Sequence, residues 1–554
     1  MNARAFAVVF FLAMLAVAAA VRLVDLGARP MHPDEAVQAY IFAGLLEQGE
    51  YRYDPGHYHG PAPHFINLPL MRVLGVRSLD ALRAWQFRLQ PALCGVLLAA
   101  LAGVCAGRDG RARWRAVALA GVSPMLVYFG RMAIHETLLA CCALAAPYAV
   151  ARWLETRRAR WLVAGGVAFG CMHATKETWC IIAFSWAVAV LALAPRRAWR
   201  VVRGGGVGRI ALAAGVAGGV ALGVSFLLYS NFGRHPEGFA DAWRALFAYR
   251  TGGGHGKGWW YYVTECLGFY RVGGWPAGEG VIGVFAGVAA VMFWWRRRDR
   301  RIGFPAPALP CFLAVSGAAQ VVVYSVIEYK TPWLMLVPLV SFVPLAAHGW
   351  VWLCGAGGAA RARDAAGARG AWRVRGVARA SGAARASGVW RVRGAAWARG
   401  VWRARDAWRT RGAWRAAGGG AACAVVVAGV LFVPALAGSF KAPASAAFPF
   451  VYAPALPEAD AELARIADAL PADAMVAVIG GDYWPLPWYF RARRDATGYF
   501  SEAGAPSAAE LGEFALVIHA GYQLDPSVTG QGWRVLELRP GYFVSVWEKP
   551  GGAD

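Results

Sequence analysis

Residues 4–35 read RAFAVVFFLAMLAVAAAVRLVDLGARPMHPDE, an apolar run that is followed closely by two adjacent carboxylates, Asp34 and Glu35. The run from Ala5 to Val21 contains no charged residue and approaches the ~20 residues that a helix needs to cross a bilayer. Its end, Ala18-Ala19-Ala20, also fits a signal-peptidase site. We expect a retained first helix, and in either case the carboxylates emerge on the outer side of the membrane.

The composition of the whole chain indicates a membrane protein. Hydrophobic residues make up 58% of the 554 residues, whereas soluble domains have an apolar share of about half. The net charge of +24 comes largely from arginines, which cluster between apolar runs, a pattern that orients membrane proteins and argues against nucleic acid as a partner. The ten cysteines form no CxxC pair, so we expect buried thiols rather than disulfides or a zinc site.

Further apolar runs predict a polytopic, mainly α protein. They lie at 91–106, 116–129, 137–151, 162–174, 179–194, 210–229, 280–295, 309–327, 334–353 and 421–438. Alternate connections carry the arginine clusters, at 108–115, 152–160, 196–209 and 296–301. The positive-inside rule makes these connections cytoplasmic. The pattern therefore predicts about eleven transmembrane helices in the plasma membrane, with the N-terminus inside and the C-terminus outside.

This topology places the polar motifs of the chain on one outer face. The motifs Gly130–Glu136, His173–Thr178 and Glu328–Pro332 fall at span ends on that side, together with the loop from Arg22 to Gln90. The topology was derived from the arginine clusters alone. It places these motifs on the same side of the membrane as Asp34 and Glu35.

Four segments are predicted. Residues 1–353 form the transmembrane domain with its outer loops, 354–420 a cytoplasmic insert, 421–438 the last transmembrane helix, and 439–554 a small outer α/β domain. The insert is rich in Arg, Trp, Gly and Ala, which indicates attraction to anionic headgroups; RNA binding is the alternative interpretation of this tract. In the last segment we expect a helix at 458–470, strands at 475–479 and 514–519, and a hairpin at 535–547.

Asp34 and Glu35 are the candidate catalytic pair. They follow Pro33 just beyond a span, where a lower dielectric keeps a carboxylate basic enough for general-base work. The structural alternative is two solvated acids at the start of a helix. The nearby histidines His57, His59 and His64 offer ligands for a divalent metal, although a structural role is the stronger interpretation for them.

Charged residues at the other outer span ends are candidates for phosphate or substrate binding. Arg131 with Glu136, and Lys176 with Glu177, place opposite charges at membrane depth, where ionisable groups suggest function. Mutual salt bridges are the alternative. Lys330 is a cation at a span entrance that either holds a lipid phosphate or extends to the headgroups.

Outward carboxylates, cations at headgroup level and an apolar body suit one chemistry. A polyprenyl-phosphate sugar lies in the bilayer with its sugar at the surface. A carboxylate base deprotonates an acceptor hydroxyl, which attacks the anomeric carbon, and cations or a metal stabilise the departing phosphate. A non-catalytic accessory factor that binds or translocates lipid-linked sugars is the alternative function.

The motifs Met31–Ala36, Ala174–Thr178, Tyr329–Trp333 and Tyr483–Tyr489 resemble the GT-C superfamily of membrane glycosyltransferases, which includes protein mannosyltransferases and aminoarabinose transferases. They are most similar to its flippase-associated subfamily from archaeal N-glycosylation. The resemblance implies a GT-C fold and inverting transfer, with Asp34 as base, Glu35 beside it and Glu136 as a second acid. It further implies basic residues at the leaving phosphate and in some members a divalent cation, for which Asp34, Glu136 and His59 are the candidate ligands.

Overall fold

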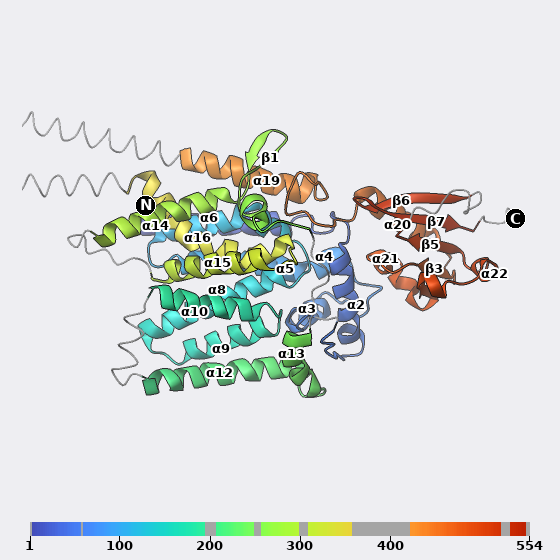
Figure 1. The fold of residues 1–554 in the computed structure, drawn as a ribbon, viewed down its shortest axis with the longest axis horizontal. Helices are drawn as coiled ribbons and strands as arrows, with labels where there is room; N and C mark the ends of the chain where they lie inside the picture. Colours follow the sequence, from blue (N-terminus) through green and yellow to red (C-terminus); the bar gives the residue numbers. More distant parts are fainter. Residues whose placement is uncertain are drawn as a thin grey trace, which may run out of the picture.

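The protein consists of a helix bundle, a layer of short helices at one end of the bundle, and a small sheet domain beyond that layer (Figure 1). The structure is a computed structural model that describes residues 3–56, 59–193, 207–248, 256–298, 308–356, 422–471, 473–521 and 532–549. His57 and nearly all of the predicted insert lie outside these residues. The predicted class, a mainly α polytopic protein with a small C-terminal α/β domain, is confirmed.

Seven helices in the described part of the chain are long and apolar enough to cross a membrane. They are Arg4–Leu23, Ala84–Cys105, Glu136–Thr156, Gly208–Tyr229, Ala308–Val326, Pro332–Cys354 and Ala422–Lys441. Their main helical elements are α1 (Ala3–Leu23), α5 (Leu89–Cys105), α8 (Glu136–Thr156), α12 (Val207–Tyr229), α15 (Ala308–Val326), α16 (Leu336–Val351) and α19 (Val433–Leu436).

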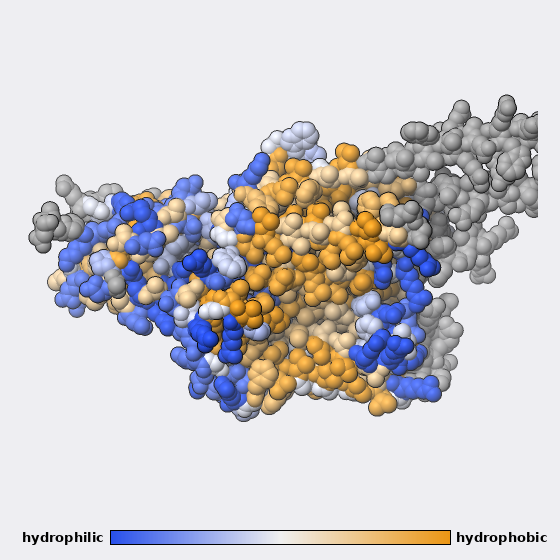
Figure 2. All heavy atoms as spheres, turned by 180° about the vertical axis from the view of Figure 1, so that it is seen from behind, coloured by the Kyte–Doolittle hydropathy of each residue, from blue (hydrophilic) through white to orange (hydrophobic). Residues whose placement is uncertain are grey.

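Four shorter helices run alongside them in Figure 1: α6 (Gly110–Val122), α9 (Arg160–His173), α10 (Trp179–Leu193) and α14 (Gly280–Arg298). Of these four, α10 and α14 contain shorter apolar helices, Trp179–Leu193 and Gly280–Trp295, and the predicted number of about eleven spans stays a prediction. Figure 2 shows hydrophobic side chains over the middle of the bundle and hydrophilic ones towards both ends, the distribution that a bilayer requires.

One predicted span is interrupted. The apolar run 116–129 is divided between α6 and α7 (Pro124–Phe129), with Ser123 in an extended conformation between them. Proline disfavours a helical conformation for the residue before it, and the Ser123 side chain accepts a hydrogen bond from Leu126 N as a new helix cap. Hydrophobicity alone therefore gave the wrong boundary here.

The layer at one end of the bundle is built from the first long loop and from later connections. It contains α2 (Pro33–Glu47), α3 (Ala62–Val73), α4 (Ala84–Phe87) and α13 (Glu237–Ala248). The hairpin of β1 (Tyr270–Val272) and β2 (Trp275–Ala277) lies beside the last span, where Gly278 N donates to Val430 O. The helix α2 carries Asp34 and Glu35 in its first turn. Eight of its fifteen residues are buried, so α2 is covered by protein.

The C-terminal domain is a five-stranded sheet with strand order β4-β3-β5-β7-β6. Its strands are β3 (Val476–Ile479), β4 (Thr497–Phe500), β5 (Leu516–Ala520), β6 (Trp533–Arg539) and β7 (Tyr542–Glu548), and its helices are α20 (Pro457–Ala469), α21 (Leu486–Tyr489) and α22 (Ala508–Leu511). The predicted helix, two strands and hairpin are confirmed. The short strand β4 was missed because its four residues at the sheet edge show no apolar run.

The sheet domain contacts α2 directly. The Tyr40 hydroxyl donates to Pro487 O at 2.8 Å, and Arg494 pairs with Glu47 at 2.8 Å. Residues 484–489, part of a motif singled out in the sequence, thus lie against the helix that carries Asp34 and Glu35.

The two ends of the bundle differ in chemistry. α5 begins beside Arg88 and ends near Arg108, and α8 begins with Glu136 and ends next to Arg157. The acidic motifs and the first two arginine clusters therefore lie at opposite ends, as predicted. Most of the arginine clusters at 196–209 and 296–301 lies outside the described residues. Assignment of the ends to compartments stays a prediction.

Candidate active site

Asp34 lies in the first turn of α2, where the local sequence fixes the backbone. His32 is the N-cap, and its Nδ1 accepts a hydrogen bond from Asp34 N at 3.1 Å. Glu35 completes a capping box by accepting from His32 N at 3.2 Å, and Pro33 occupies a position that suits its fixed φ. Asp34 is partly exposed, at a position that the helix cap fixes.

Glu35 is turned in the opposite direction and has no solvent-exposed surface. Its carboxylate accepts hydrogen bonds from Arg88 Nε at 2.8 Å, from Arg88 Nη2 at 2.7 Å and from Ala133 N at 2.8 Å. Arg29 lies 3.7 Å away. Burial alone would raise the pKa of Glu35, but the charges of Arg88 and Arg29 outweigh it and lower the pKa to about 2.

Arg88 extends this anchor to the chain before α2. Its Nη1 donates to Leu26 O and Arg29 O, and its Nη2 donates to Pro30 O. The buried pair therefore fixes the start of α2 to α5 and to the segment before α8. The adjacent acids have different environments, since Glu35 is an internal anchor and Asp34 faces outward.

Aromatic and cationic groups surround Asp34. The His32 Nε2 bonds to Tyr452 O at 2.9 Å, and the ring of Trp333 lies 5.5 Å from that of Tyr452. Burial and the nearby Asp34 carboxylate raise the pKa of Tyr452. The Lys257 ammonium lies 4.6 Å from the centre of the Tyr452 ring, so a positive charge lies against this ring.

A second polar cluster lies at the neighbouring helix ends. Lys176 Nζ donates to Glu136 Oε1 at 2.5 Å, and both side chains are nearly buried. His59 Nδ1 bonds to Glu177 Oε2 at 2.8 Å. Burial would raise the pKa of Glu177, but the hydrogen bond and charge of His59 lower it. The structure brings these four predicted residues together.

The charge partners differ from those predicted. Lys176 pairs with Glu136 rather than with Glu177, because the end of α9 lies against the start of α8. Arg131 does not bond to Glu136; it donates to the carbonyls of Val21, Arg22, Val24 and Asp25 and so caps the C-terminal end of α1. Lys330 is also buried and donates to Ile327 O at 2.5 Å, where it caps the end of α15.

The predicted metal ligands do not form a metal site in the part of the chain that the structure describes. No group of three or more His, Cys, Asp or Glu side chains there is placed to hold a metal ion. Glu136 is engaged by Lys176, and His59 by Glu177. His64 is buried against Phe42, and burial lowers its pKa to about 3, so it is a neutral core residue. Among the described residues, Asp34, Glu136 and His59 therefore do not form a ligand set for a metal ion.

Sequence reasoning missed several residues of the site. Arg88, Lys257, Tyr452 and Trp333 were not predicted as contributors, because they reach Glu35 or Asp34 only through the tertiary fold. Of these four residues, Trp333 alone lies in a motif singled out in the sequence, at 329–333. Tyr452 had no sequence signal.

Comparison with known proteins was made at the level of sequence and of structure. The family described as dolichyl-phosphate-mannose-protein mannosyltransferase matches residues 66–217. No curated protein sequence matches the chain significantly. Among solved structures, ArnT from Cupriavidus metallidurans in the apo state aligns over 98% of both chains, with a TM-score of 0.58 and 16% identity. The chain has the GT-C fold.

Two further structures with the GT-C fold agree with this result. ArnT from the same organism bound to undecaprenyl phosphate aligns over 98% of both chains, with a TM-score of 0.57 and 17% identity. The oligosaccharyltransferase of Archaeoglobus fulgidus in the apo form aligns over 92% of this chain and 69% of its own, with a TM-score of 0.52 and 12% identity. These matches give no support to the narrower flippase-associated prediction.

Proposed function

We propose that this protein is a membrane glycosyltransferase that moves a sugar from a polyprenyl-phosphate carrier to an acceptor hydroxyl at the membrane surface. The observation that carries the proposal is the pair of neighbouring acids on α2. Asp34 is accessible at a helix start that the buried Glu35 and Arg88 hold in place. The GT-C fold supports the reaction class, and the undecaprenyl phosphate bound by the structurally similar ArnT supports the donor class.

In the proposed reaction Asp34 is the general base. It takes the proton of the acceptor hydroxyl as that oxygen attacks the anomeric carbon. The bond from the anomeric carbon to the donor phosphate oxygen breaks, and the polyprenyl phosphate leaves with the bonding electrons. Attack from the side opposite the leaving group inverts the anomeric configuration. A positioned base of this kind contributes about 10²- to 10⁴-fold to the rate.

Cations near Asp34 stabilise the departing phosphate in this proposal. Lys257 is the best-placed candidate, because its ammonium lies over the Tyr452 ring beside Asp34. Lys176 is a second candidate whose charge is shared with Glu136. Glu35 and Arg131 act indirectly, since they hold the helix start and the end of α1.

The test is complementation of a strain that lacks the protein, with cell-envelope glycans and lipids measured by mass spectrometry. We expect wild type and Asp80→Asn, which changes an exposed acid of the same loop, to restore the missing modification. Asp34→Asn should reach the membrane in equal amount and fail to restore it. Restoration by Asp34→Asn would refute the catalytic assignment and favour a non-catalytic role in handling lipid-linked sugars.

A further inference from the structure

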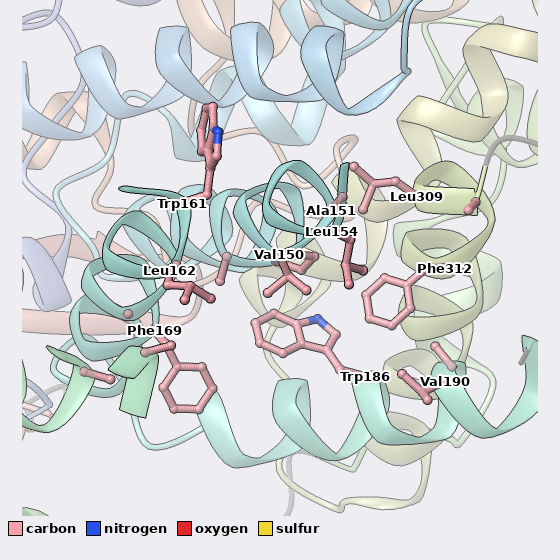
Figure 3. Close-up of a pocket in the computed structure, with 18 of the residues that line it drawn as sticks. Val150, Ala151, Leu154, Trp161, Leu162, Phe169, Trp186, Val190, Leu309 and Phe312 are labelled. Atoms are coloured by element: carbon pink, nitrogen blue, oxygen red, sulfur yellow. The ribbon is translucent and has the colours of Figure 1, made fainter. Parts of the chain in front are cut away.

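A large apolar cavity lies in the bundle towards the arginine end, away from Asp34. Its volume is about 650 Å³, within the range of pockets that hold small ligands, ~300–1,000 Å³. Five helices contribute to it: α8, α9, α10, α12 and α15. Figure 3 shows Trp186 of α10 between Phe169 of α9 and Phe312 of α15, with Trp161 of α9 at the edge of the cavity.

The cavity opens on the outer surface of the bundle. Its lining residues Val150, Leu154 and Val190 remain 48%, 53% and 45% exposed. All three belong to helices with the length or composition of membrane segments. Water has no hydrogen-bond partners in such a space, whereas a hydrocarbon chain fills it without loss. The occupant that the walls select is therefore a lipid chain.

The mouth of the cavity carries positive charge. Arg160 lies 5.4 Å and Arg152 5.6 Å from the centre of the Trp161 ring, which lines the cavity. Arg157 and Arg158 are exposed in the turn that joins α8 to α9. Among the described residues, Arg152 pairs with Glu155, whereas Arg157, Arg158 and Arg160 form no ion pair with a carboxylate. A net positive group thus stands where a lipid headgroup would lie.

We propose that this cavity is a binding site for an anionic phospholipid, with one acyl chain against Trp161 and Trp186 and the phosphate facing Arg157, Arg158 and Arg160. Apolar contact alone does not favour a bound lipid over the surrounding lipid, since lipid chains are as apolar as the cavity walls. Selectivity therefore comes from the arginines, which attract anionic headgroups. The site is at the opposite end of the bundle from Asp34, so it does not depend on the proposed function.

The test uses the full-length protein in nanodiscs of equimolar phosphatidylglycerol and phosphatidylethanolamine, followed by partial delipidation and native mass spectrometry. We expect wild type to retain phosphatidylglycerol with about tenfold preference. The variant Arg157→Gln/Arg158→Gln/Arg160→Gln should lose that preference. A control with three exposed arginines at the other end, Arg52→Gln/Arg72→Gln/Arg77→Gln, should keep it.

A second variant separates the cavity from general surface charge. Val150→Trp/Val190→Trp fills the cavity from two partly exposed positions and should remove the retained lipid although every arginine is present. Val163→Trp enlarges a similarly exposed residue of α9 that does not line the cavity and should retain the lipid.

Three results would overturn the proposal. They are equal retention of the two phospholipids by wild type, retention of phosphatidylglycerol by the filled-cavity variant, and recovery of a polyprenyl phosphate in place of a phospholipid after purification from cells. The last result would assign the cavity to the carrier chain of a sugar donor.

Discussion

The carboxylate of Glu35 and the guanidinium of Arg88 form a buried pair joined by two hydrogen bonds of 2.7 and 2.8 Å. Arg88 is 1% exposed and Glu35 has no exposed surface. Because Arg88 also binds the carbonyls of Leu26, Arg29 and Pro30, the pair fixes the segment that leads into α2 and so positions the neighbouring Asp34.

Removal of one partner of this pair should destabilise the protein strongly. Glu35→Gln or Arg88→Leu leaves a buried charge without its counter-charge, which costs about 3–5 kcal/mol. Thermal unfolding of the detergent-solubilised protein should show a lower Tm for both variants, with little change for the exposed Glu50→Gln. An unchanged Tm for Glu35→Gln would contradict the anchoring role.

The same pair predicts a dependence of stability on acid pH. The pKa of Glu35 is about 2 in the folded protein against its ordinary value of 4.5. Its stabilising contribution is therefore complete above pH 4.5 and is lost as the pH falls towards 2. The Tm difference between wild type and Glu35→Gln, measured across this interval, should shrink as the pH is lowered. A difference that stays constant would show that Glu35 does not titrate in this way.

The pair of Lys176 and Glu136 allows stability to be separated from activity. Lys176→Met removes the ammonium that pairs with the nearly buried Glu136 and should lower the Tm. Lys176→Met/Glu136→Gln should recover much of that loss, because no uncompensated charge remains. If Lys176 stabilises the leaving phosphate, the double variant should recover stability but transfer sugar more slowly than wild type. Wild-type transfer by the double variant would limit both residues to a structural role.

Lys257 should affect transfer more than folding. Its ammonium is half-buried beside Tyr452, and the loss of a charge-assisted contact to a phosphate costs about tenfold or more in kcat/KM. Lys257→Gln should show this loss while Lys257→Arg retains most activity. Lys441→Gln, a change of an exposed lysine at the end of the last span, is the control and should leave transfer unaffected.

His32 should tolerate a substitution that preserves its cap. His32→Asn retains a side-chain acceptor for Asp34 N, whereas His32→Ala loses about 1 kcal/mol of capping energy. We therefore expect the Tm of His32→Asn to lie above that of His32→Ala. Equal Tm values would show that the cap contributes little to stability.

Features that depend on neighbouring residues could be predicted from the sequence. The apolar runs gave the bundle, the arginine clusters separated its two ends, and the alternating pattern at 535–547 gave the hairpin of β6 and β7. The run 116–129 misled because hydropathy does not register the conformational restriction that Pro124 imposes on Ser123.

The sequence also placed the candidate acidic and basic site residues at one end of the bundle. This was possible because apolar runs and charged connections are local features of the chain. The sequence does not show which of the two carboxylates is buried. The residues themselves do not distinguish these adjacent acids, although the resemblance implied Asp34 as the base. Contacts with Arg88, at the start of α5, and with Ala133 bury Glu35. These hydrogen bonds join residues that are 53 and 98 positions apart in the chain, so the burial of Glu35 depends on the whole fold.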